Sequence, residues 1–171
     1  KLTIHKIDFS RLHEYSSLVK GDILFSALGT TKKEAGGKKE QFRVDYTYQY
    51  AFAKIASKNN VAHYSLVSSV GANKSSFFFY PKIKGALESS VKSLRFNTIH
   101  IFQPPSLIRQ PELIRIGEKY IIKLLQVINK LGLLKSFKPL LVKDLAKKII
   151  DESLINKTKG VTIYQSQDLY N

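Results

Sequence analysis

Short apolar runs alternate with stretches of helical spacing along the first part of the chain. The runs at 22–28, 61–68 and 97–103 are nearly uninterrupted and too short for helices, which is typical of parallel strands covered on both faces. Residues 41–59 and 77–94 place their apolar side chains at helical intervals. Because strands and helices alternate, the pattern predicts an α/β fold with a parallel sheet between two layers of helices.

Further elements are predicted on both sides of this region. Residues 1–7 alternate in the manner of a strand that leads to Asp8, and 10–19 is expected to form a short helix capped by Ser10. After two consecutive prolines the pattern predicts two helices and a last strand, at 112–131, 142–154 and 161–165.

Size and composition restrict the class of protein. The chain has 171 residues, 43% of them hydrophobic, which suffices for the core of one domain and not of two. It has neither an apolar run of about 18 residues nor a signal-peptide pattern, so we expect a soluble, cytoplasmic protein without membrane contact. The absence of cysteine excludes disulfides and thiolate metal sites, and the four histidines are too scattered to indicate a metal site.

The net charge of +15 favours phosphate-bearing partners in principle. However, the lysines are spread over every segment and do not gather on one periodic face. We therefore expect a solvated basic surface, and nucleic-acid binding is disfavoured.

The chain also contains no methionine and starts at Lys1, which is unusual for a protein of this length. Either it is a fragment or methionines are missing from the sequence as written.

The residues that follow the predicted strands are the first candidates for chemistry, because open parallel sheets bind ligands at the carboxyl ends of their strands. Ser68 and Ser69 end one such strand, and the next helix carries Tyr80 and Lys84. A tyrosine and a lysine four residues apart share one helical face, where the ammonium group can stabilise a phenolate. Such a tyrosine can exchange a proton near neutral pH.

The spacing alone has little specificity, because Tyr50 and Lys54 repeat it. Only Tyr80 has serines eleven and twelve residues upstream, at the end of an apolar strand. The alternative is that Tyr80 is an ordinary aromatic of an amphipathic helix and that the serines form a strand-ending turn.

Six blocks resemble, in order and spacing, the atypical short-chain dehydrogenases related to the Tat-interacting protein, including bacterial homologues: HKIDF, LFSALGTT, AGGKKEQFRVDY, LVSSVGANKSSFFFYPKIKGALE, FQPPSLI and VKDLAKKI. The resemblance covers nearly the whole chain. It implies one Rossmann-like, doubly wound parallel sheet with helices on both faces, formed by 1–171, in which 105–171 supplies the substrate-side helices and last strand. It also implies a nicotinamide dinucleotide as cofactor, NADP being slightly favoured over NAD.

The resemblance implies roles for individual residues. Tyr80 fits the general acid/base, and Lys84 fits the residue that holds the nicotinamide ribose and lowers the tyrosine pKa. Ser68 fits the family serine better than Ser69. Cofactor contacts are expected from Asp8 near the adenine, from Pro104 beside the nicotinamide, and from Gly29, Thr30, Ser68 and Lys84.

Three features depart from the family pattern. Gln103 stands where relatives commonly have arginine, which argues against an ion pair there. Pro81 is tolerated only in the first turn of a helix, so we expect Tyr80 near the helix start. The first strand, the glycine-rich turn and the helix that hold the pyrophosphate are missing, so we expect roughly 40 further residues upstream.

Two functions remain open on these grounds. The first is an NAD(P)-dependent oxidoreductase that transfers hydride to or from a small carbonyl or alcohol. The second is a regulatory or redox-sensing module that binds the same cofactor with little turnover, since a fold does not determine function. The sequence indicates neither the substrate nor the oligomeric state.

Overall fold

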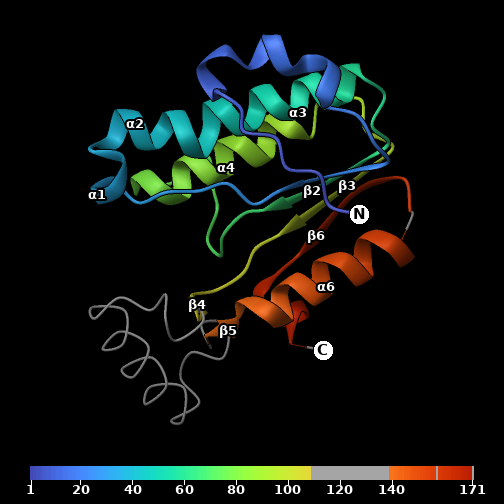
Figure 1. Ribbon diagram of the computed structural model, residues 1–171. Coiled ribbons are helices and arrows are strands. Elements are labelled where there is room, and N and C mark those ends of the chain that lie inside the picture. Colours follow the sequence, from blue (N-terminus) through green and yellow to red (C-terminus); the bar gives the residue numbers. More distant parts are fainter. Residues whose placement is uncertain (109–138, 157, 171) are drawn as a thin grey trace.

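A computed structural model describes residues 1–108, 139–156 and 158–170. Its centre is a sheet of four parallel strands in the order β1-β2-β3-β6 (Figure 1). The strands are β1 (Ile23–Ser26), β2 (His63–Val67), β3 (Thr98–Phe102) and β6 (Gly160–Tyr164). Three of them lie within apolar runs predicted from the sequence and β6 matches the predicted last strand, so the parallel sheet is confirmed.

Helices cover both faces of the sheet, as predicted (Figure 1). One face carries α4 (Phe79–Val91) and a long helix built from α2 (Lys38–Phe42), the π-helical segment η2 (Arg43–Tyr48) and α3 (Gln49–Lys58). The other face carries α6 (Val142–Ile155). This is the Rossmann-like arrangement expected for the chain.

Alternation along the strands separates two cores, because successive side chains point to opposite faces. Tyr64, Leu66, Ile99 and Ile101 pack against α3 and α4 with Ala53, Leu87 and Val91. Phe102 points the other way and joins a second cluster that includes Leu145 of α6 and Tyr164 of β6.

The predictions for the first residues are partly wrong. Residues 1–8 form no strand in the described structure, and Leu2 and Ile4 are exposed. Two alternating apolar residues make a weak strand signal, and a strand also needs a neighbour to accept its hydrogen bonds. The next helix is the 3-10 helix η1 (Phe9–Leu18), and its cap is Asp8 in place of Ser10.

Several short elements had no sequence signal. They are α1 (Lys32–Ala35), β4 (Leu107–Ile108), β5 (Leu140–Leu141) and the 3-10 helix η5 (Ser166–Leu169). The helix predicted at 112–131 lies outside the described residues. Among the residues that are described, no helix is long and apolar enough to cross a membrane.

Gly85 of α4 allows the loop after β2 to cross this helix in contact with it. A Cβ atom at Gly85 would overlap the backbone of Asn73 and Lys74. The amide of Asn73 also donates to the carbonyl of Pro81 at 3.0 Å. The absence of a side chain at Gly85 therefore helps to position the loop that begins at Ser68.

Two buried histidines lie on the α6 face, and we expect them to make the stability of the protein depend on pH. The rings of His63 and His100 are 4.4 Å apart, and the nitrogens of the fully buried His100 have no hydrogen-bond partner among the described residues. Burial, helped by the neighbouring His63, lowers the pKa of His100 from 6.5 to about 4, and burial also lowers the pKa of His63. Both rings are therefore neutral in the folded protein at pH 7.

The unfolded chain binds these protons more tightly than the folded protein does. We therefore expect the free energy of unfolding to be highest above pH 6.5 and to fall as the pH drops toward about 4. The expected loss from His100 is on the order of 3 kcal/mol, measured by urea unfolding at several pH values. His100→Phe should flatten this dependence, whereas replacing the exposed His13 should not. Equal slopes for the parent and His100→Phe would contradict the prediction.

Candidate functional site

A cavity of ≈530 Å³ lies at the carboxyl ends of β1 and β2. It gathers five of the residues predicted from the sequence, from three separate segments: Gly29, Thr30, Ser68, Tyr80 and Lys84. Its other lining residues are Ala27, Leu28, Thr31, Lys32, Glu34, Gln41, Val67 and Leu107. The structure thus assembles most of the predicted site at the strand ends, where parallel sheets bind ligands.

Tyr80 is the second residue of α4, which begins at Phe79. Pro81 follows it within the first turn, where a backbone N–H has no partner inside the helix and its loss costs little. The expectation that Tyr80 lies near the helix start is confirmed. This position leaves the side chain 40% exposed at the edge of the cavity.

The surroundings of Tyr80 keep its phenol protonated. Partial burial raises the pKa of Tyr80, the negative charge of Asp45 raises it further, and a hydrogen bond with the Ser69 side chain lowers it. The net direction is upward, whereas the family resemblance implied that Lys84 lowers this pKa. In this structure the Lys84 ammonium group is directed elsewhere and donates to the carbonyl oxygen of Val67 at 3.1 Å.

Lys84 lines the cavity, where it can contact a ligand, yet only 2% of its surface is exposed. Burial lowers its pKa, because removing an ammonium group from water disfavours the charged form. The charges of Asp45 and Glu88 oppose this effect and raise the pKa.

The two serines after β2 have different surroundings. Ser68 is buried, and its hydroxyl donates to Glu88 Oε1. Ser69 is half-buried, its hydroxyl donates to the Val70 carbonyl at 3.3 Å, and its side chain lowers the pKa of the Tyr80 phenol. Ser68 lines the cavity and Ser69 does not, whereas Ser69 influences the Tyr80 phenol, so the preference for Ser68 stays a prediction.

Gly29 and Thr30 form the turn after β1. The Thr30 amide donates to Asp45 Oδ2 at 3.4 Å, and Gln41 Nε2 donates to the Thr30 carbonyl at 3.3 Å. A Cβ atom at Gly29 would lie 3.2 Å from Asp45 Oδ1, which is closer than an ordinary contact. The small residue expected at Gly29 therefore lets the turn approach the π-helical segment.

Asp8 and Pro104, the other two predicted cofactor contacts, do not line this cavity. The carboxylate of Asp8 caps η1 by accepting hydrogen bonds from the Ser10 amide and hydroxyl at 2.8 and 2.7 Å. These hydrogen bonds lower the pKa of Asp8. Pro104 is buried and accepts a hydrogen bond from the Val70 amide at 2.9 Å, which ties the segments after β2 and β3 together.

Three polar residues near the cavity were missed: Asp45, Glu88 and Gln103. Glu88 follows Lys84 by four residues, so the shared helical face could have indicated a contact. Gln103 was noted only as a departure from arginine; its amide donates to both Glu88 carboxylate oxygens, at 3.0 and 3.2 Å. Asp45 had no sequence signal, because only the fold brings its helix to this edge.

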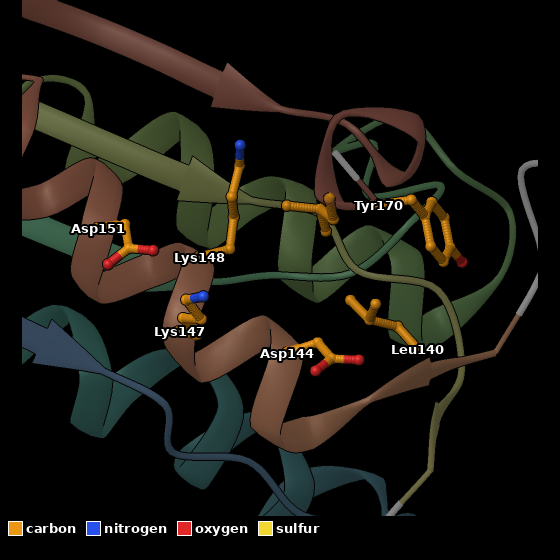
Figure 2. A pocket seen from close by; sticks show the side chains of 7 residues that line it. Leu140, Asp144, Lys147, Lys148, Asp151 and Tyr170 are labelled. Carbon is orange, nitrogen blue, oxygen red and sulfur yellow. The ribbon is translucent and has the colours of Figure 1, made fainter.

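A second hollow, of ≈410 Å³, lies beside α6 (Figure 2). It is lined by Leu140, Asp144, Lys147, Lys148, Asp151, Leu169 and Tyr170. Its acidic and basic side chains come from one helix and balance in charge, and Lys148 forms an ion pair with Glu152 at 3.0 Å. Because none of the predicted site residues lines it, the strand-end cavity is the candidate functional site.

Several known proteins are similar in sequence to this chain. No family model matches the chain. It is 39% identical to the protein HTATIP2 of Rattus norvegicus over 114 residues, which is 66% of this chain and 46% of that protein. It is 43% identical to the mitochondrial protein FMP52 of Debaryomyces hansenii over 84 residues, covering 49% of this chain and 37% of that protein. The matches thus span less than half the length of these relatives.

Solved structures give the fold. The Bordetella bronchiseptica enzyme WbmG in complex with NAD and UDP has a TM-score of 0.66 at 16% identity, covering 92% of this chain and 55% of that one. The human epimerase family protein SDR39U1 with NADPH has a TM-score of 0.60 at 14% identity, covering 90% and 60%. A short-chain dehydrogenase/reductase superfamily protein from Agrobacterium tumefaciens with bound NAD has a TM-score of 0.64 at 10% identity, covering 92% and 64%.

These findings confirm the resemblance seen in the sequence. The relatives named FMP52 are called mitochondrial, so the cytoplasmic location stays a prediction. The chain is similar in sequence to HTATIP2 and FMP52, and it has the Rossmann-like fold seen in solved structures of short-chain dehydrogenase/reductase proteins.

Proposed function

We propose that the protein is an NAD(P)-dependent oxidoreductase that transfers hydride to or from a small carbonyl or alcohol. The observation that carries this proposal is the convergence of Gly29, Thr30, Tyr80 and Lys84 on one cavity at the carboxyl edge of the sheet. Structural neighbours with bound NAD or NADPH support a nicotinamide dinucleotide as the cofactor. A preference for NADP remains part of the proposal.

The donors on the cavity wall suit such a cofactor. Lys32 and Lys84 supply ammonium groups, and Thr30 and Thr31 supply hydroxyls. Ammonium groups and hydroxyls bind phosphate and ribose oxygens well. The remainder of the dinucleotide would lie along the turn at Gly29, where the backbone is exposed.

Each residue has a defined task in this reaction. A reduced nicotinamide held at this cavity would supply hydride chemistry for the carbonyl carbon of a substrate. Tyr80 donates its hydroxyl proton to the carbonyl oxygen, so that an alcohol forms and a phenolate remains, which solvent reprotonates. The hydroxyl of Ser69 or Ser68 holds the carbonyl oxygen near the phenol, and Lys84 binds the ribose.

A cofactor-binding regulatory or redox-sensing module is the second candidate. Two observations favour it: the pKa of Tyr80 is raised, and Lys84 is hydrogen-bonded to the Val67 carbonyl. A site for fast proton exchange would have a tyrosine with a lowered pKa. Saturable dinucleotide binding without turnover over a wide substrate screen would favour this module.

The test is a titration of the full-length protein with NADPH and with NADH at low salt, followed by the quenching of protein fluorescence or by calorimetry. We expect saturable binding of at least one dinucleotide, weakened by Lys84→Ala because the buried ammonium group is a cofactor contact. Lys54→Ala is the matched control, since Lys54 does not line the cavity. Absence of saturable binding to both dinucleotides would refute the proposal.

The two serines give a second prediction. Ser69→Ala should lower turnover by about 10-fold or more if Ser69 orients the carbonyl oxygen, because its side chain influences the Tyr80 phenol. Ser68→Ala should mainly lower stability, by about 1 kcal/mol or more, because it leaves Glu88 without one of its donors. Turnover and urea unfolding of both variants separate these effects. A larger loss of turnover in Ser68→Ala would assign the catalytic role to Ser68, the serine that lines the cavity.

A further inference from the structure

One lysine of the cavity wall and two nearby carboxylates are buried together at the candidate site. Lys84 is 2% exposed, Glu88 is 5% exposed, and Asp45 is fully buried. They come from two helices, since Asp45 belongs to η2 and the other two residues to α4. Burying ionised groups is costly unless each one is paired or hydrogen-bonded, so such a group of charges requires an explanation.

Glu88 connects the ends of two strands. Its carboxylate accepts hydrogen bonds from the Ser68 hydroxyl, directly after β2, and from the Gln103 amide, directly after β3. The amide of Ser68 in turn donates to the Phe102 carbonyl at 2.7 Å. Glu88 thus holds the residues that follow both strands. The Gln103 side chain supplies an uncharged hydrogen-bond donor to its carboxylate.

Asp45 does the same for the third segment of the cavity. Its Oδ2 accepts the hydrogen bond from the Thr30 amide after β1, and its Oδ1 faces Gly29. Oδ1 has no hydrogen-bond partner among the described residues. Asp45 lies in a π-helical segment, a distortion of the helix that is frequent at functional sites.

Lys84 lies within the electrostatic range of both carboxylates and holds the end of β2 through the Val67 carbonyl. The ends of β1, β2 and β3 are therefore all held by the charged groups of this cluster. We propose that Asp45 and Glu88 are positioning residues that keep the Lys84 ammonium group between them and hold the three strand ends in the arrangement that binds the dinucleotide. This inference rests on the proposed function, because it assigns the cluster a task in cofactor binding.

The three residues should be distinguishable by titration. Asp45 and Glu88 both raise the pKa of Lys84 against the effect of burial, and Asp45 also raises the pKa of Tyr80. Asp45→Asn should therefore lower the pKa of both Lys84 and Tyr80. Glu88→Gln should lower the pKa of Lys84 alone. The titration shows which carboxylate acts on the Lys84 ammonium group, and the NADPH affinity measured beside it separates a positioning role from a purely structural one.

The experiment uses the full-length protein with ¹³C-labelled lysine side chains, titrated by NMR from about pH 6 to about pH 11, a range that covers ordinary lysine and tyrosine ionisation. Lys84→Arg assigns the Lys84 signal, and the tyrosine absorbance of the parent minus that of Tyr80→Phe follows Tyr80. Glu34→Gln is the control, because Glu34 is an exposed carboxylate on the wall of the same cavity. NADPH affinity is measured for each variant over the same pH range.

We expect the Lys84 midpoint to fall in Asp45→Asn and Glu88→Gln and to stay in place in Glu34→Gln. The dissociation constant for NADPH should rise by about tenfold in Glu88→Gln, as for loss of one charge-assisted contact. The loss of binding with rising pH should begin at a lower pH than in the parent. If Asp45→Asn does not fold, the Lys84 midpoint and the NADPH affinity of Glu88→Gln test the inference without it.

The possible failures are separable. An unchanged Lys84 midpoint in a folded Glu88→Gln overturns the inference, even if NADPH binds normally. A shifted midpoint in a protein whose parent binds neither NADPH nor NADH refutes the proposed function and removes the task assigned to the cluster. A shifted midpoint with unchanged NADPH affinity overturns the positioning role.

Discussion

Replacing Tyr80 by phenylalanine should lower turnover by about 10²–10⁴, the usual contribution of a positioned general acid or base. The change removes one hydroxyl and leaves the ring, so the free energy of unfolding and the affinity for the dinucleotide should stay close to those of the parent. The measurement is steady-state kinetics with NADPH, after a screen of small aldehydes, ketones and quinones has supplied a substrate.

Tyr50→Phe is the internal control for this prediction. Tyr50 is also followed by a lysine four residues later, but it lies in α3, packs against the core and does not line the cavity. Its replacement should leave turnover unchanged. Lys84→Ala should lower both turnover and dinucleotide affinity. If Tyr80→Phe turned over as fast as the parent, the catalytic assignment would be wrong and the cofactor-binding module would be the better proposal.

Gly85→Ala should cause a large loss of stability. A methyl group there would overlap the backbone of Asn73 and Lys74, and backbone cannot move aside as a flexible side chain can. The free energy of unfolding should fall by about 3 kcal/mol or more, toward the upper end of overpacking effects. Urea unfolding followed by circular dichroism measures this loss.

Ala86→Ser is the matched control for Gly85→Ala. It lies on the same helix and is only partly buried, so its effect should be within about 0.5 kcal/mol. If Gly85→Ala keeps the fold by displacing the loop, Ser69 should move away from Tyr80 and turnover should fall with it. A Gly85→Ala protein as stable as Ala86→Ser would show that the loop does not need this close approach.

The elements that the sequence predicted well are those with long, consistent patterns. The strands at 61–68 and 97–103 and the helices at 41–59 and 77–94 appear as β2, β3, the α2–α3 helix and α4. Their apolar residues face layers on both sides of the sheet, so burial and local preference agree. The segment 1–7 had only two alternating residues, and a strand depends on a partner that local pattern does not supply.

The candidate site was likewise predicted in part from the sequence. The strand-end rule and the resemblance placed Gly29, Thr30, Ser68, Tyr80 and Lys84 together, and the structure brings all five to one cavity. Neither could show which hydroxyl lies beside the phenol, because Ser68 and Ser69 differ by one position at the end of a strand. The structure distinguishes their partners, since Ser68 donates to Glu88 and Ser69 influences the Tyr80 phenol.

By itself, the sequence therefore determined the order of strands and helices, the parallel sheet and the edge at which the site lies, because periodicity and topology depend on residues near one another in the chain. Only the tertiary structure decided the electrostatics. The buried Asp45 comes from another helix, raises the pKa of Tyr80 and opposes the effect of burial on Lys84. Such contacts join residues distant in sequence, and desolvation exists only after the helices pack, so no spacing along the chain could have indicated them.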